Sequence, residues 1–452
     1  MGYFKTEQEK IMYNDFSTSN RSLFRVTRKQ LWLAFLFPTL FLADILYGLL
    51  DYYGFSSPVS PGIFLRGFAL FLAVTMILKY RYCIPQHVFR WCLGTLLLTF
   101  PSIIYSFAVG CTYDIGRDIL YILRAVYGPL MILLVIILIR IYSISVQNFL
   151  AYIEGTAYLL GITLLISRNI GIERLTYGTY AYGDTGVFYA QNDLSLTFGL
   201  TLLAASYRVI EEFSITRCLL LILSIWSCLQ IGTKASAIVI VINALFIITL
   251  AVWGETSSRG GWSHRQKKSF FPAFVISGIM IILSGYGFIL QSQSSYQKEK
   301  IEKILINREL PRSMLITSGL YYFQKRALFL HVTGEGMVSY MSNLPAYLKN
   351  QQFTLKEKNV EVDFIDFIGA YGVFFSVIIH LFFFVLLYVS FKSYIRTRDN
   401  IYGAIFVAVC MYTGHSLLAG HAMCSPTPTT LIAGYAGFYF RNKNAKKKTV
   451  NN

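Results

Sequence analysis

Apolar runs of about 20 residues recur along nearly the whole chain, and this feature constrains the fold more than any other. A run of that length crosses a bilayer as an α-helix, because a helix satisfies its backbone polar groups internally. A membrane β-barrel would instead show short alternating segments. Only 14% of the 452 residues are charged, whereas a soluble protein carries about 25%. The sequence therefore predicts an all-α, polytopic membrane protein and excludes an ordinary cytosolic enzyme.

The apolar runs divide the chain into twelve predicted spans and one large loop. Residues 1–30 form an N-terminal segment, 31–290 hold spans one to nine, 291–365 form the loop, 366–440 hold spans ten to twelve, and 441–452 form a basic tail. The predicted spans lie near residues 31–50, 61–78, 88–110, 119–139, 149–167, 189–207, 216–231, 234–253, 271–290, 366–390, 401–420 and 425–440.

Basic residues predict the orientation of the chain. With the N-terminus inside, the cytoplasmic segments hold 24 Lys and Arg residues, and the short outer loops hold four, namely Arg117, Arg168, Arg174 and Lys234. The positive-inside rule then places both termini in the cytoplasm. The net charge of +17 does not indicate nucleic-acid binding, because the basic residues lie between apolar runs instead of forming one basic stripe. We expect no cleavable signal peptide, since residues 1–30 are polar and basic and the next apolar run is long enough to remain a span.

The segment 291–365 is too long for a simple connection between spans. Its 75 residues include ten Lys or Arg, seven Asp or Glu and several aromatic residues. Loops beyond about 12–15 residues are usually functional or disordered, and this one is too aromatic for a disordered linker. We expect a folded, partly helical cap on the outer face, over the cations described next. A smaller outer loop, 168–189, is rich in Tyr and Gly.

Charged residues inside or beside the spans gather at the outer boundary. Because such residues are costly in hydrocarbon, they are functional candidates. A cationic cluster at this depth suits an anionic group such as a lipid-linked phosphate or pyrophosphate. The alternative is that each Arg pairs with Asp44 or Asp118, or reaches nearby headgroups, and only holds helices together. The cluster consists of Arg66, Arg124, Arg117, Lys234 and the Asn192–Asp193 pair.

The sequence shows no metal-binding pattern. The six histidines include His331 in the large loop and His415 and His421 near the outer end of the eleventh span, and no pair has the spacing of zinc ligands on a helix. The seven cysteines also lack metal-ligand or redox spacing. We therefore expect no metal and no cofactor.

Three stretches together resemble the bacterial O-antigen polymerases and O-antigen ligases. The first is Gly186-Val-Phe-Tyr-Ala-Gln-Asn192-Asp193-Leu, which leads from the small outer loop into a span, and the second is Gly232-Thr-Lys234-Ala-Ser236-Ala, a short outer turn. The third runs from Arg312 through Gly334 and Gly336 to Gly369 and Gly372. The order of these motifs, combined with one oversized outer loop, carries the resemblance over residues 180–375.

The resemblance implies a GT-C-like architecture in a bacterial plasma membrane and a metal-independent glycosyl transfer at its external face. The donor would be a polyprenyl-pyrophosphate-linked oligosaccharide, built into O-antigen, capsule or exopolysaccharide, and a flippase and a chain-length regulator are possible partners. An acceptor hydroxyl would attack the anomeric carbon, so the site needs a base and fixed cations. Arg312 and Lys234 match basic positions of the family. Arg124, Arg117 and Arg174, with Asn192, are further candidates for binding the pyrophosphate or glycan.

Departures from the family pattern favour a polymerase over a ligase. Ligases carry a His-Asn pair before the final glycines, and here Glu361 or Lys358-Asn359 occupies that stretch. Glu361, with Asp363 behind it, becomes the candidate base, and His331 is a third catalytic candidate. The alternative for the two carboxylates is that they only begin the tenth helix, where acidic residues favour the helix dipole.

Two other functions stay open. A flippase for the same lipid-linked oligosaccharide fits the twelve spans, although no internal repeat of the kind found in many transporters is visible. A ligase would use the same donor and differ only in its product.

Overall fold

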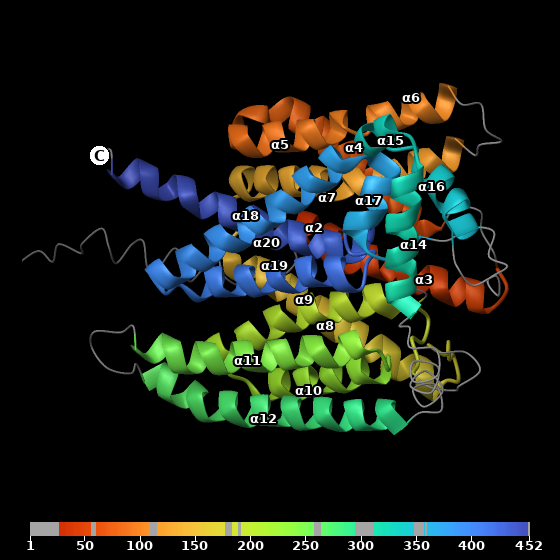
Figure 1. The fold of residues 1–452 in the computed structure, drawn as a ribbon. Coiled ribbons are helices and arrows are strands. Elements are labelled where there is room, and N and C mark those ends of the chain that lie inside the picture. The colour runs from red at the N-terminus through yellow and green to blue at the C-terminus, as the bar shows by residue number, and fades with distance from the viewer. Residues whose placement is uncertain are drawn as a thin grey trace, which may run out of the picture.

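The computed structural model describes residues 27–55, 60–108, 115–176, 183–188, 191–256, 264–293, 311–347, 357 and 359–450. Long helices run side by side along one direction, and shorter helices gather at one end of them (Figure 1). Over these residues, β-pairing is limited to an isolated bridge between Leu175 and Asp184. The prediction of an all-α fold is confirmed.

The helices follow the predicted spans closely over most of the chain. The first span joins α2 (Arg28–Ala34) to α3 (Leu40–Tyr52) through a π-helical turn at Phe35–Thr39, which contains Pro38. The remaining long helices are α4 (Pro61–Tyr80), α5 (Gln86–Leu97) with α6 (Phe100–Ala108), α7 (Ile115–Ile141), α8 (Val146–Asn169), α9 (Gln191–Glu211), α10 (Ile215–Gln230), α11 (Lys234–Thr256), α12 (His264–Gln293), α18 (Val373–Thr397), α19 (Asn400–Leu418) and α20 (Pro426–Val450).

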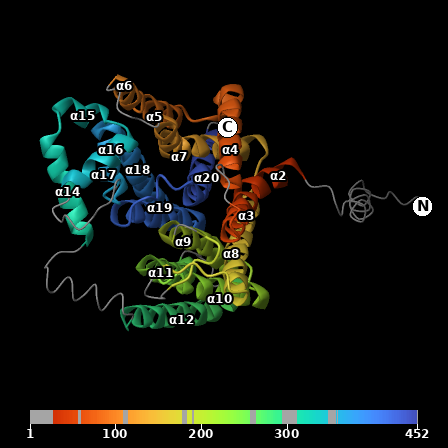
Figure 2. The ribbon, with the colours of Figure 1, turned by 90° about the vertical axis from the view of Figure 1, so that its right-hand side faces the viewer.

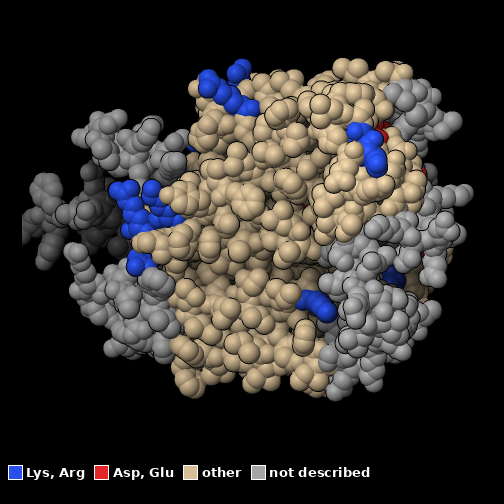
Figure 3. Space-filling model, viewed as in Figure 1, with Lys and Arg blue, Asp and Glu red and all other residues tan. Residues whose placement is uncertain are grey.

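The lengths and compositions of these helices suit a membrane. Among the described residues, seven helical segments are long and apolar enough to cross one, and α10, α11 and α12 contain shorter apolar stretches. Many large apolar side chains on the outside of the bundle are exposed, as a lipid-facing surface requires. In Figure 3, the visible Lys and Arg side chains lie toward the two ends of the helices and leave an uncharged surface between them. The protein is a multi-pass membrane protein.

The helices α9 and α20, like much of α7, are enclosed by other helices. Residues Leu194–Val209 of α9 are all buried, and so are Leu431–Phe440 of α20. Ser195, Thr197 and Thr201 in α9 each donate a hydrogen bond to a backbone carbonyl one turn earlier in the helix. A helix that faces protein on all sides can carry such polar residues, since lipid does not contact it.

Five short elements cover part of one end of the bundle. We call the segments 311–347 and 359–372 the cap, and the end that carries it the cap end. The cap contains α14 (Pro311–Lys325), α15 (Leu328–Thr333), α16 (Met337–Asn343), a 3₁₀ turn at Leu344–Tyr347 and α17 (Asp363–Tyr371). Looking onto this end, α14 to α17 lie to one side and α3, α4 and α8 to the other (Figure 2).

The predicted span near 366–390 is divided at Gly372. This residue has φ +86° and separates α17 in the cap from α18 in the bundle. A Cβ atom there would lie 2.0 Å from the carbonyl oxygen of Val332, so the backbones approach too closely for any other residue. The apolar run of the sequence continues through this break, because both helices bury apolar side chains.

Candidate functional site

A cavity of about 420 Å³ lies at the cap end of the bundle, between α3, α4, α7, α8, α9 and the start of α20. That volume lies within the range of about 300–1,000 Å³ typical of small-molecule sites. Its wall is mostly apolar, with four charged side chains from four different helices: Asp44, Arg66, Arg124 and Asp193. The cavity therefore collects intramembrane charges that are far apart in the sequence.

Arg66 has its charge satisfied inside the protein. Its guanidinium forms a two-pronged ion pair with Asp44 and donates a further hydrogen bond of 2.8 Å to Thr427 Oγ1. Such a fork holds α4, α3 and α20 together. Sequence analysis offers two interpretations of Arg66, ligand binding or pairing with Asp44, and the structure shows the pairing.

Arg124 is exposed to the cavity. It makes no ion pair with any residue in the described part of the chain, and its guanidinium lies 5.5 Å from the ring centre of Tyr121. Asp118, its other predicted partner, points elsewhere: its carboxylate accepts the Val338 amide at 2.9 Å and connects α7 to the cap. Arg124 is thus available to an anionic ligand.

Asp193 lies across the same cavity in the first turn of α9. It lies beside Ser425 and within electrostatic reach of Arg124 and His421. The loop between α19 and α20 brings His421 here and supplies Cys424 and Ser425 to the cavity wall, and Pro426 and Thr427 at the start of α20 continue this wall. A carboxylate and a guanidinium therefore face one space large enough for part of a ligand.

The cap holds this loop in place through Asp363. Its two carboxylate oxygens accept the backbone amides of His421, at 2.6 Å, and Met423, at 2.9 Å. Beside it, Glu361 adopts φ +64°, and its carbonyl oxygen would lie 2.1 Å from a Cβ at Gly420. The loop that forms part of the cavity wall is therefore fastened to the segment before α17.

Asp366 organises the same segment of the cap. It accepts hydrogen bonds from the Val360 amide at 2.9 Å, the Glu361 amide at 3.1 Å and the Tyr340 hydroxyl at 3.1 Å. Burial raises the pKa of Asp366 to about 6 and also raises the pKa of Asp363. Both carboxylates are used by backbone and side-chain donors of the protein itself.

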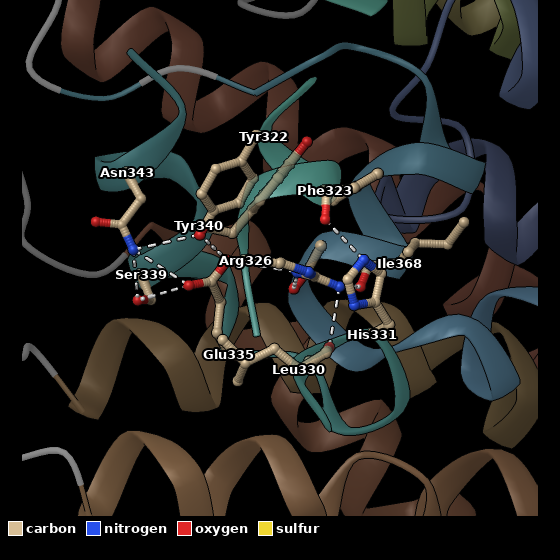
Figure 4. A network of polar contacts seen from close by, with 12 residues as sticks. Tyr322, Phe323, Arg326, Leu330, His331, Glu335, Ser339, Tyr340, Asn343 and Ile368 are labelled. Atoms are coloured by element: carbon tan, nitrogen blue, oxygen red, sulfur yellow. Dashed lines mark hydrogen bonds and ion pairs between the residues drawn. The ribbon is translucent and has the colours of Figure 1, made fainter. Parts of the chain in front are cut away.

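Arg326 forms the centre of the cap. It is 2% exposed, lies 3.5 Å from Glu335, and donates to the carbonyl oxygens of Leu330, Ile368 and Gly369 at 2.9–3.1 Å. Figure 4 shows this network together with Glu335, which also accepts hydrogen bonds from Tyr322, Asn343 and Ser339. Burial raises the pKa of Glu335. One guanidinium thus joins the ends of α14, α15 and α17.

The predicted site residues are not all brought together. His331 Nε2 lies 2.8 Å from the Phe323 carbonyl oxygen within the cap. Arg117 pairs with Glu357 at 2.6 Å, and Arg174 pairs with Asp51 at 2.8 Å. Lys234 is exposed at the start of α11 and does not line the cavity. Asn192 does not line the cavity either, although the next residue in the sequence, Asp193, does. Arg312 lies in the first turn of α14, and its side chain is outside the described residues.

The cap lies beside the cavity, contrary to the expectation that it lies over the cations. The described cap residues are not among those that line the cavity. The reason is that α17 packs against α18 and α19, on the side of the bundle away from α4. Among the described residues, the cap contacts the cavity wall through the α19–α20 loop and through α7, where Asp118 accepts the Val338 amide.

Sequence reasoning gives too little weight to Asp193, His421 and the α19–α20 loop. The predicted depth in the membrane treats Asp193 and Asn192 as one pair and does not single out the carboxylate. The histidines are considered only as metal ligands, and since their spacing does not fit a metal site, His421 is assigned no function. The available signal is the run Gly420-His-Ala-Met-Cys-Ser-Pro-Thr427, which interrupts two apolar spans with polar His421, Ser425 and Thr427 and contains a helix-starting proline, Pro426.

Comparison with known families decides the class of protein. The model of a family described as O-antigen ligase like membrane protein matches residues 27–313. The chain belongs to this family. A search of curated proteins finds no match. The matched region includes the four charged residues of the cavity, and the family makes this protein a membrane enzyme of O-antigen and polysaccharide assembly.

Proposed function

We propose that the protein is a glycosyltransferase that polymerises polyprenyl-pyrophosphate-linked oligosaccharide repeat units at the external face of the bacterial plasma membrane. The observation that carries the proposal is the cavity with Arg124, a cation without a carboxylate partner among the described residues. The repeat units would belong to an O-antigen, a capsule or an exopolysaccharide.

The apolar wall of the cavity supports a lipid-linked donor. Ile63 on α4 and Leu120 and Leu123 on α7 line the cavity and are 40–45% exposed. A polyprenyl chain can lie against these side chains in the bilayer while its diphosphate reaches Arg124. An apolar surface that adjoins a cation supports the binding of a ligand with an apolar tail and an anionic head group.

In the proposed reaction, the acceptor hydroxyl forms a bond to the anomeric carbon of the donor as the bond to the diphosphate oxygen breaks. Arg124 stabilises the negative charge that develops on the departing diphosphate. Asp193 accepts the hydroxyl proton, because it is the cavity carboxylate not engaged in an ion pair with a described residue. Glu361, Asp363 and His331 lie outside the cavity wall, and Glu361 stays the second candidate for the base.

The test uses purified protein in lipid vesicles supplied with the lipid-linked repeat unit of its own organism. The expected product is a ladder of longer chains. Arg124→Ala should lower the rate by about 10²–10³, as the loss of one charge-stabilising donor does in other enzymes. Asp193→Asn should abolish the ladder.

Arg117→Ala is the matched control for Arg124→Ala. Arg117 is on the same helix, but its charge is paired with Glu357 and it does not line the cavity. It should keep most of the activity. A folded Arg124→Ala variant with full activity would contradict the proposal. Transfer to an acceptor that is not lipid-linked would indicate a ligase, and translocation without a product would indicate a flippase.

A further inference from the structure

The cap helix α15 presents its apolar side chains outward. Leu328 is 83% exposed, Phe329 54% and Val332 48%, whereas Leu330 between them is buried. His331 also points inward, toward the Phe323 carbonyl oxygen. The outward positions are spaced as one face of a helix. A helix surrounded by water would carry polar residues on this face.

The position of α15 relative to the spans explains its outward apolar face. The Phe329 ring lies 5.8 Å from the ring of Tyr105, which lies in the last turn of α6. The Val332 backbone approaches Gly372, the residue that precedes the span α18. The helix α15 therefore lies level with the end of one membrane span and the beginning of another.

The surface around α15 is the lipid-facing surface of the bundle. Ile104 and Phe107 on α6 are 66% and 68% exposed, and Phe374 at the start of α18 is 53% exposed. The exposed apolar side chains of α15 therefore have exposed apolar side chains on both helices that α15 packs against, α6 and α18. A helix at this height with an apolar outer face suits the boundary between lipid head groups and acyl chains.

We propose that α15 is an interfacial helix that inserts Leu328, Phe329 and Val332 into the outer edge of the bilayer and so anchors the cap to the lipid surface. The inserted helix is fixed from within by Arg326, which donates to the Leu330 carbonyl oxygen and to the end of α17. The anchor does not depend on the reaction that the enzyme catalyses. The segment predicted as an external loop is then partly a membrane-bound element.

The test measures the depth of a spin label at three positions in vesicles of phosphatidylcholine and phosphatidylglycerol. Single cysteines replace Leu328, Phe107 and Gln324 in a chain whose natural cysteines are changed to alanine. Phe107 is the lipid reference, and Gln324, exposed at the end of α14, is the aqueous reference. Relaxation by oxygen reports lipid, and relaxation by a water-soluble nickel chelate reports water.

The ratio of oxygen to nickel relaxation should be several-fold higher at position 328 than at 324, and close to that at 107. A ratio at 328 equal to that at 324 would overturn the proposal. Shielding of position 328 from both reagents would also overturn it, because a protein surface would then cover the helix. As a second measurement, tryptophan in Phe329→Trp should be quenched by lipids brominated on their acyl chains.

Discussion

At the scale of single residues, buried charges decide how the cap holds together. Arg326 and Glu335 are both 2% exposed, so their charges are removed from water and depend on each other and on the surrounding carbonyl and hydroxyl groups. Removing one partner of such a pair leaves an uncompensated charge, which costs more than the pair itself contributes.

Arg326→Met should therefore destabilise the protein by about 3–5 kcal/mol, since it strands Glu335 and also removes one of the two donors to carbonyl oxygens of α15 and α17, which keep only their backbone amides. Glu335→Gln keeps the shape, but it leaves the Arg326 charge without its partner and puts an amide NH2 group where a carboxylate oxygen accepts hydrogen bonds, so it should also cost about 3–5 kcal/mol. Thermal unfolding in detergent measures both. Equal stability of Arg326→Met and the parent protein would contradict this account of the network.

The buried carboxylates of the cap also predict a pH dependence. The pKa of Asp366 is raised to about 6 in the folded protein, and those of Asp363 and Glu335 are raised as well. Because the folded state then binds more protons than the unfolded one, stability is greatest below the ordinary carboxyl pKa, about 4, and falls as the pH rises through 6.

The unfolding temperature of the cap should accordingly decrease between pH 4 and pH 7. Asp366→Asn should flatten part of this slope, and scanning calorimetry at several pH values would show it. Glu357 works in the opposite direction, because pairing with Arg117 lowers its pKa, but both side chains are about one-third exposed and the effect is screened. A stability that rises with pH over this range would refute the argument.

At the scale of elements, glycines allow the cap to pack against the bundle. Gly334 and Gly372 each bring their backbone against a carbonyl oxygen of the opposing segment, at Ala370 and Val332. Both have positive φ, so a side chain would meet strain as well as contact.

Gly372→Ala should separate α15 from α18 and cost more than the strain of the left-handed conformation alone, about 1–2 kcal/mol. Gly54→Ala is the matched control, because Gly54 has φ +81° and no described atom lies within 4 Å of the position that its new methyl group would take. The difference between the two unfolding free energies isolates the close approach. Equal costs would mean that the contact with Val332 relaxes freely.

Predictability from the sequence differs between elements for physical reasons. The positions of the long helices can be predicted, because apolar runs are visible in the local sequence. The break at Gly372 does not, because it depends on the carbonyl oxygen of Val332 in a different helix. Asp363 illustrates the same limit at the site: its position before a helix suggests a base or a helix-start residue, whereas its partners are the amides of the α19–α20 loop. Arg66 and Arg124 have the same predicted depth in the membrane, so the sequence does not distinguish them. The tertiary structure does, because it shows that Arg66 pairs with Asp44.

At the scale of the whole molecule, the orientation in the membrane remains a prediction with a direct test. Basic residues predict both termini in the cytoplasm and the cap end outside. A fluorescent protein fused after residue 452 should fold and fluoresce in cells, and Gln324→Cys should react with a membrane-impermeant maleimide added from outside. Labelling of that cysteine only after the membrane is permeabilised would reverse the orientation and move the proposed reaction to the other face.

The attachment of the α19–α20 loop by Asp363 also constrains how the enzyme can diverge. The cap and this loop must change together, because the carboxylate of one positions the amides of the other. A chimera that exchanges residues 311–372 alone with those of a relative would lose this match and distort the cavity wall. Transplanting residues 311–372 together with 419–427 would preserve this match, because the Asp363 carboxylate and the two amides that it accepts would then come from the same protein.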